Sequence, residues 1–112
     1  MKESLVVKSC IEWLHLNGCF IWRNNTGAYK PEGSAGFIRY GLAGSADIIG
    51  VNPHGKFIAV ECKSEKGKLL ESQVGFGIKV RSRGGVYVVA RSTDDLESHR
   101  DVLLGARNKD AI

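Results

Sequence analysis

The segment "FIAVECKS", residues 57–64, decides the fold of this chain. It begins with four apolar residues, as a buried β-strand does, and then carries Glu61 and Lys63 on either side of Cys62. Because successive side chains of a strand point to opposite faces of a sheet, Glu61 and Lys63 share one face. The sequence therefore places a carboxylate and an ammonium group together at the end of an apolar strand.

The segments around this strand predict an α/β domain with one mixed sheet flanked by helices, spanning residues 1–112. The turn "NPHG" at 52–55 joins the strand to an antiparallel partner. Hydrophobic periodicity and capping residues predict a helix at 3–16 followed by strands at 19–25, 46–51 and 56–64. A helix at 70–82, a strand at 86–92 and a helix from Ser92 or Thr93 to about Leu104 are predicted to follow.

Two segments carry no clear periodicity. The stretch "TGAYKPEGSAGFIRYGLAG", residues 26–44, is predicted to be a long glycine-rich loop with a short strand around Phe37 to Tyr40. A loop of that length in a small domain is usually functional or mobile. The C-terminal "GARNKDAI", residues 105–112, is expected to be frayed.

Composition narrows the class of protein. The 112 residues suffice for one domain, and the formal charge of +4 with a pI near 9.1 is compatible with a polyanionic partner. Cys10, Cys19 and Cys62 form no CxxC pair and are interpreted as buried thiols in a reducing compartment. No signal peptide, membrane-spanning stretch or zinc-ligand spacing is present in the sequence, so we expect a cytoplasmic protein.

Asp47 opens the strand that the turn folds against Glu61 and Lys63. The two carboxylates are then expected within a few ångströms of each other, with Lys63 beside them. Carboxylates drawn together repel unless a positive charge lies between them, and a hard cation such as Mg²⁺ prefers oxygen ligands. Water activated by such a cation beside Lys63 would be a nucleophile for a phosphodiester.

Two polar residues fall on the apolar stripes of the predicted helices. Glu3 shares the stripe of the first helix and Gln73 that of the second, so both are expected to face the sheet. Taken singly, each acidic or amide residue has a simpler interpretation: Glu3 as a capping acid, Gln73 as a helix N-terminal residue, Asp47 as a turn residue, and Glu61 with Lys63 as a surface ion pair.

The ordered set "E…RNNTG…GSADIIG…ECK…Q", from Glu3 to Gln73, resembles the VRR-NUC branch of the PD-(D/E)xK nucleases, including its small stand-alone members from bacteria and phages. The resemblance extends to about Ala90 and implies a restriction-endonuclease-like αβββαβ core. It implies an endonuclease that hydrolyses DNA with Mg²⁺ or Mn²⁺ in a bacterial or phage-infected cell. Ser45-Ala46 stands where many members have a proline before the aspartate.

The resemblance also implies roles for individual residues. Asp47, Glu61 and the backbone carbonyl of Cys62 correspond to the metal ligands. Glu3 corresponds to an acid that binds the metal directly or through water. Lys63 corresponds to the residue that orients the attacking water, and Gln73 to the one that orients Lys63 or the phosphate. The small stand-alone members resemble homodimers that cut branched DNA such as four-way (Holliday) junctions.

Basic and polar residues outside this set could contact the DNA backbone, because phosphate contacts position a duplex without reading its sequence. The candidates are Arg23, Asn25, Lys30, Arg39, Lys66 and Lys68. The lysines and Arg39 could instead form only a solvated basic surface. Arg23 and Asn25, with their neighbours Asn24 and Thr26, could instead cap the end of the first strand and support the site. Two other functions stay open from the sequence: a DNA-binding subunit that does not cut, and a nuclease of linear DNA or RNA.

Overall fold

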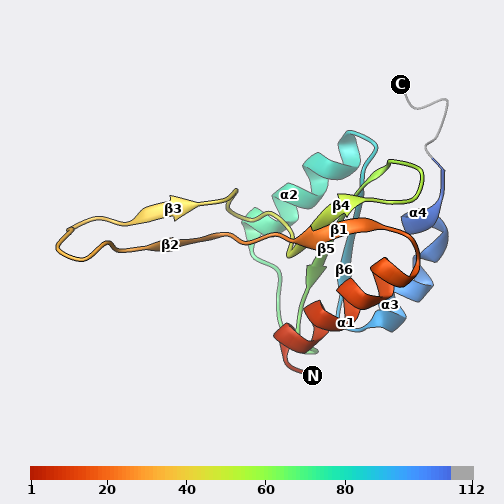
Figure 1. The fold of residues 1–112 in the computed structure, drawn as a ribbon, viewed down its shortest axis with the longest axis horizontal. Coiled ribbons are helices and arrows are strands. Elements are labelled where there is room, and N and C mark those ends of the chain that lie inside the picture. The colour runs from red at the N-terminus through yellow and green to blue at the C-terminus, as the bar shows by residue number, and fades with distance from the viewer. Residues whose placement is uncertain (107–112) are drawn as a thin grey trace.

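A computed structural model describes residues 1–106 of the chain. The predicted αβββαβ core is confirmed. Its elements are α1 (Glu3–Leu16), β1 (Phe20–Arg23), β4 (Ile48–Val51), β5 (Phe57–Cys62), α2 (Glu71–Ser82) and β6 (Val86–Ala90) (Figure 1). The remaining elements are β2 (Gly27–Tyr29), β3 (Ile38–Tyr40), α3 (Thr93–Ser98) and α4 (Arg100–Leu104).

The main sheet has the order β1-β4-β5-β6 and is mixed. β4 pairs antiparallel with β1 on one side and with β5 on the other, through the turn that the sequence predicted at 52–55. β5 and β6 pair in parallel, and α2 makes the crossover that a parallel pair requires. β5 is therefore a central strand, and its C-terminal end lies next to the beginning of β4.

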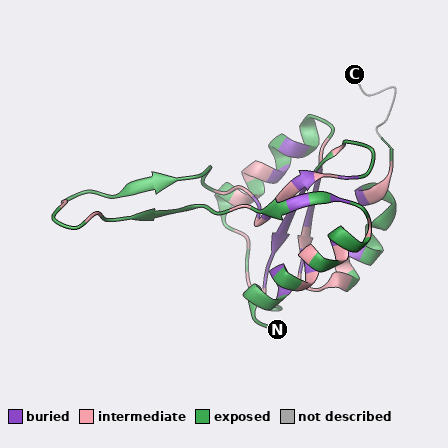
Figure 2. Cartoon of the chain, in the orientation of Figure 1, coloured by how far each residue is buried: buried purple, intermediate pink, exposed green. Residues whose placement is uncertain are grey.

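Different helices pack on the two faces of the sheet. Helices α1, α3 and α4 pack on one face, where apolar residues such as Val7, Leu14, Ile58 and Leu96 form the larger core cluster. α2 packs on the opposite face against a smaller cluster that contains Ala59, Val80 and Tyr87. β5 contributes its even-numbered residues to the first cluster and Ala59 to the second, as strand alternation requires. Figure 2 shows the buried residues gathered in this body.

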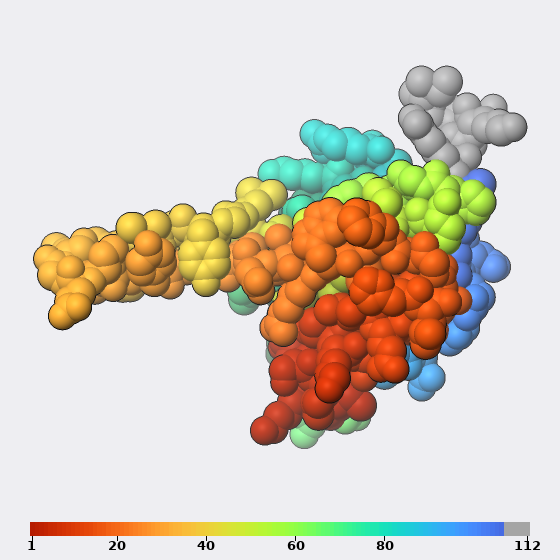
Figure 3. Space-filling model, viewed as in Figure 1, coloured from red at the N-terminus to blue at the C-terminus, as the bar shows by residue number. Residues whose placement is uncertain are grey.

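Residues 26–44 were predicted to be a loop with one short strand, and this prediction is wrong because the segment contains two paired strands. β2 and β3 pair antiparallel in a separate two-stranded sheet, with Gly27 opposite Tyr40 and Tyr29 opposite Ile38. We call residues 26–42 the arm. It extends away from the body and gives the molecule a longest dimension of 52 Å (Figures 1 and 3). The sequence located the strand near Phe37 to Tyr40, but not its partner.

The last predicted helix is divided in two. Ser92 caps α3 as expected, because its hydroxyl accepts a hydrogen bond from the Asp94 N–H at 3.2 Å. At His99 the backbone leaves helical geometry, and α4 begins at the next residue. Of the C-terminal segment expected to fray, residues 107–112 lie outside the described part of the chain. Within residues 1–106, no helix is long and apolar enough to cross a membrane.

The close pairing of β1 and β4 gives a test of the fold. Gly50 has φ +156°, and a Cβ there would collide with the carbonyl oxygen of Phe20 and the Cα of Ile21. We expect Gly50→Ala to lower the free energy of unfolding by at least about 2 kcal/mol in urea titrations. Gly75→Ala is the matched control, because a Cβ added there would meet no atom within 4 Å, and a mid-helix alanine stabilises by roughly 0.5–1 kcal/mol. Equal effects of the two substitutions would contradict the β1–β4 register.

Candidate active site

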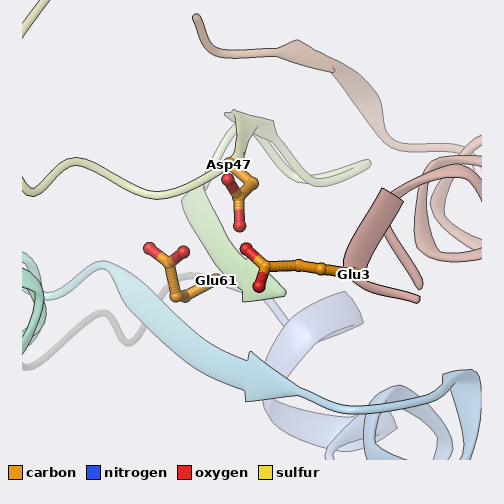
Figure 4. Close-up of side chains that lie close together, drawn as sticks. All are labelled: Glu3, Asp47 and Glu61. Carbon is orange, nitrogen blue, oxygen red and sulfur yellow. The ribbon is translucent and has the colours of Figure 1, made fainter. Parts of the chain in front are cut away.

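Three carboxylates from distant parts of the chain meet where β5 ends and β4 begins. Glu3 comes from the first turn of α1, Asp47 directly precedes β4, and Glu61 is the penultimate residue of β5 (Figure 4). One oxygen from each lies within 4.8 Å of the others. We call these three residues the acidic cluster. The sequence predicted all three members, and it predicted that Glu3 faces the sheet.

Backbone pairing sets the position of Asp47. The β4–β5 register places Ile48 opposite Val60, so Asp47 comes beside Glu61. The carboxylate of Asp47 accepts a hydrogen bond from the Cys62 N–H at 2.8 Å. This bond replaces the backbone pairing that ends at Ile48, and it holds the aspartate against the end of β5.

Asn24, just beyond β1, fixes the chain on the other side of Asp47. Its N–H donates to the Asp47 carbonyl at 2.7 Å, and its side-chain amide donates to Ser45 Oγ at 2.7 Å and the Ala46 carbonyl at 2.9 Å. The short "RNN" segment therefore supports the acidic cluster through the backbone. The predicted structural use of this asparagine is consistent with its bonds.

Glu61 is deeply buried, with 1% of its surface exposed, and its Oε2 atom has no hydrogen-bond partner among the described residues. Burial, together with the neighbouring carboxyl of Asp47, raises the pKa of Glu61 to about 9. The positive charge of Lys63 opposes this rise. A buried carboxylate oxygen without a partner, next to two further carboxylates, is the arrangement that a divalent cation would neutralise.

Lys63 follows Cys62 at the end of β5, and its N–H donates to the Ala90 carbonyl of β6 at 3.0 Å. Its side chain is 8% exposed. The interpretation of Glu61 and Lys63 as a surface ion pair is therefore wrong, because both residues are buried. Within residues 1–106 the one ion pair joins Arg100 to Glu97, far from this site in the sequence.

A cavity of about 430 Å³ opens beside the acidic cluster and is lined by Asp47, Glu61 and Gln73. Gln73 is half-buried, and its Oε1 accepts a hydrogen bond from the Leu70 N–H at 2.9 Å. This is the helix N-terminal bond that the simpler interpretation of Gln73 predicted. The side chain thus caps α2 and faces the cavity at once.

The base of the arm forms the opposite wall of this cavity. Arg39 and Tyr40 of β3 line it together with Thr26 and Gly27. Of the six predicted DNA contacts, Arg39 therefore lies at the site. The other five do not line the cavity. Arg23 is exposed at the end of β1 and Asn25 just after it, Lys30 is exposed on the arm, and Lys66 and Lys68 are exposed between β5 and α2.

Sequence reasoning missed Tyr40, and also Tyr87 of β6. Tyr87 is 5% exposed, lies under α2 and has a hydroxyl without a hydrogen-bond partner in the described chain. Burial, and next the negative charge of Glu61, raises the pKa of Tyr87 to about 12. The "VYVV" pattern resembles any apolar strand, so only the fold reveals that this hydroxyl lies near the acidic cluster.

The fold and the acidic cluster agree with a comparison against known families. A family model described as the VRR-NUC domain matches residues 1–94. The chain belongs to the VRR-NUC family. A VRR-NUC domain indicates a nuclease-type function in DNA processing, and the acidic cluster of this member could hold a metal ion. Comparisons with curated proteins and with solved structures gave no match.

The raised pKa of Glu61 predicts how the stability of this VRR-NUC domain depends on pH. The folded protein keeps a proton on Glu61 up to about pH 9, whereas the unfolded chain releases it near the ordinary value of 4.5. Because the unfolded state binds fewer protons between these values, the contribution of Glu61 to stability falls as pH rises through this window.

Glu61→Gln removes this titration. In EDTA, we expect the variant to match the wild type near pH 5 and to exceed it near pH 8 by at least about 1 kcal/mol, the free energy of one pKa unit. Thermal unfolding across pH 5–9 measures the difference, with the exposed Glu12→Gln on α1 as control. A stability difference that does not change with pH would contradict the raised pKa.

Proposed function

We propose that this VRR-NUC domain is a Mg²⁺- or Mn²⁺-dependent endodeoxyribonuclease that prefers branched DNA such as four-way junctions and acts as a homodimer. The observation that carries the proposal is the acidic cluster, in which the Oε2 atom of Glu61 is buried without a hydrogen-bond partner among the described residues and the carboxyl groups of Glu3 and Asp47 lie close by. An enzyme that hydrolyses phosphodiesters with a divalent metal ion needs such a set of oxygen ligands to bind the ion.

Asp47 and Glu61 would hold the metal, with the Cys62 carbonyl as a third ligand and Glu3 binding directly or through water. In antiparallel pairing a residue directs its N–H and C=O to the same side. The Cys62 N–H points to Asp47, so its carbonyl is expected on that side too. Glu3 is exposed, which suits a ligand reached through water. When bound, the ion would supply Lewis acidity to the scissile phosphate and to the attacking water.

Lys63 would hold the attacking water in line with the scissile bond and stabilise the negative charge that develops on the phosphate. Its buried position strengthens this interaction, since little water screens the ammonium. Gln73 already engages its Oε1 with the Leu70 N–H, which leaves its amide N–H groups to donate into the cavity. It would orient a phosphate oxygen there.

The predicted DNA contacts divide by position. Arg39, in the cavity wall, would reach the phosphate near the cut. Lys66 and Lys68, in the exposed segment after β5, would bind the DNA backbone on one side of the site. Arg23, Asn25 and Lys30 would bind the DNA backbone on the side of the arm. All six would position DNA without reading its sequence.

The homodimer is supported by the surface of the arm. Tyr29, Phe37, Ile38, Tyr40 and Leu42 are about half exposed or more. A two-stranded hairpin is marginally stable alone, and aromatic residues are typical of protein interfaces. Two copies related by a two-fold axis would provide two active sites, which symmetric cutting of a junction requires.

A DNA-binding subunit that does not cut is the competing function. It would have no use for an acidic cluster that weakens the fold. Burying Glu61 beside Asp47 is unfavourable, and a polyanionic ligand would be repelled by the negative charge of a cluster of acidic residues. The retained cluster therefore favours catalysis.

The decisive experiment compares a labelled four-way junction with linear duplex and single strand, in Mg²⁺, Mn²⁺ or EDTA. We expect paired, metal-dependent cuts at the junction, and a rate at least about 100-fold lower for Lys63→Ala. Lys8→Ala, an exposed lysine on α1, controls for lost charge. Tight junction binding without cutting would establish the binding subunit instead, and equal cutting of every DNA would remove the preference for branches.

The arm gives a separate prediction for assembly. Tyr29→Ser combined with Phe37→Ser removes two exposed aromatic rings without touching the core. We expect this variant to shift from dimer to monomer in light scattering coupled to gel filtration. Leu16→Ser, at an apolar residue of α1 that is more exposed than either aromatic ring, should leave the dimer intact. A monomeric wild type would refute the homodimer.

A further inference from the structure

Arg91 follows the last residue of β6 and binds a segment distant in sequence. Its Nη1 donates to the carbonyl oxygens of Ser64 at 2.6 Å, Glu65 at 3.2 Å and Gly67 at 2.7 Å. We call residues 64–67 the lysine loop, because it begins directly after Lys63. A single guanidinium nitrogen thus gathers three carbonyl groups of one short loop.

The lysine loop packs on the side chain of Lys63. The loop closes on itself through the Gly67 N–H, which donates to the Ser64 carbonyl at 3.1 Å. A Cβ at Gly67 would lie 3.4 Å from Lys63 Cδ, so the glycine approaches the aliphatic part of the lysine closely. This contact contributes to the burial of Lys63, a residue type that is usually exposed.

Arg91 is itself firmly placed. Its own N–H donates to the carboxylate of Asp95 at 2.7 Å, at the start of α3. The neighbouring Ala90 carbonyl accepts the Lys63 N–H. The end of β6 therefore holds Lys63 by its backbone and the lysine loop by the Arg91 side chain. The guanidinium group of Arg91 stays protonated at all relevant pH values, so its hydrogen bonds to the loop do not change with pH.

We propose that Arg91 is a positioning residue, which holds the lysine loop against Lys63 and so keeps the lysine ammonium directed at the acidic cluster. A lysine side chain has four rotatable carbon–carbon bonds and disperses its charge unless it is packed. The proposal rests on the proposed role of Lys63 in hydrolysis. Arg91 belongs neither to the acidic cluster nor to the residues that line the cavity, so its effect on hydrolysis would pass through Lys63.

Arg81 is a matched control for the loss of a guanidinium. It lies near the end of α2, and its Nη2 donates to the Tyr87 carbonyl at 3.1 Å in a hydrogen bond that is partly buried, as are those of Arg91 to Ser64 and Gly67. Arg81→Met and Arg91→Met each remove one positive charge and at least one bond to the backbone. Only Arg91→Met frees the lysine loop.

The test compares these two variants with Arg91→Lys and wild type. Pulse labelling with an amine-reactive reagent, without metal or DNA, reports the exposure of Lys63 by mass spectrometry. We expect Arg91→Met to increase Lys63 labelling several-fold over Arg81→Met. We expect its kcat to fall roughly 10- to 100-fold while KM changes as in Arg81→Met. Arg91→Lys, which can reach one carbonyl, should lie between Arg91→Met and wild type in both readouts.

Unchanged Lys63 labelling, or a kcat loss no larger than that of Arg81→Met, would overturn the proposal. Should Arg91→Met lose its circular dichroism, Arg91→Lys and Gly67→Ala decide the question. Gly67→Ala adds a methyl group 3.1 Å from Ser64 Oγ and 3.4 Å from Lys63 Cδ, so the lysine loop and Lys63 have to shift against each other by a few tenths of an ångström with no change of charge. Labelling needs no nuclease activity, so increased labelling in a protein that cuts no DNA would refute the proposed function and leave the positioning role standing.

Discussion

The hydrogen bond from the Cys62 N–H to the carboxylate of Asp47 joins the end of β5 to the beginning of β4. It brings Asp47 beside Glu61 and continues the strand pairing by one residue beyond the ladder. Glu3 completes the cluster from α1, which is packed on the sheet by its apolar stripe. Three of the proposed ligands, Asp47, Glu61 and the Cys62 carbonyl, therefore depend on β5 and on what binds its last residues.

Alternate side chains of β5 point to opposite faces of the sheet, so one face carries the larger core and the other carries Glu61. Ile58, Val60 and Cys62 enter the larger core, while Ala59 and Glu61 face α2. The larger core is continuous and contains no charged side chain, so it can stabilise a second face that carries an unfavourable buried carboxyl. A metal ion bound only by the folded state would offset part of this unfavourable free energy.

The acidic cluster could be predicted because its members sit at points fixed by local rules: a helix stripe, a strand start and a strand end. The arm could not, because β2 has three residues including a glycine, and its turn residues show no strand period. The roles of Arg91 and Tyr87 could not be predicted from the sequence for another reason. Their partners are a distant loop carbonyl and a distant charge, which only the parallel pairing of β5 and β6 brings near. The break at His99 has no counterpart in the apolar pattern of the last helix.

The arm leaves and re-enters the body at one place, because Gly27 pairs with Tyr40 at its base. Its length is thereby uncoupled from the sheet, and the entropy of closing a longer loop grows slowly, by about 0.6 kcal/mol for each doubling. Insertions at the tip would leave β1, β4 and the acidic cluster in register. The base of the arm, by contrast, is a wall of the cavity. The fold thus offers evolution and protein engineering a site where new contacts can be added to a nuclease domain without rebuilding its acidic cluster.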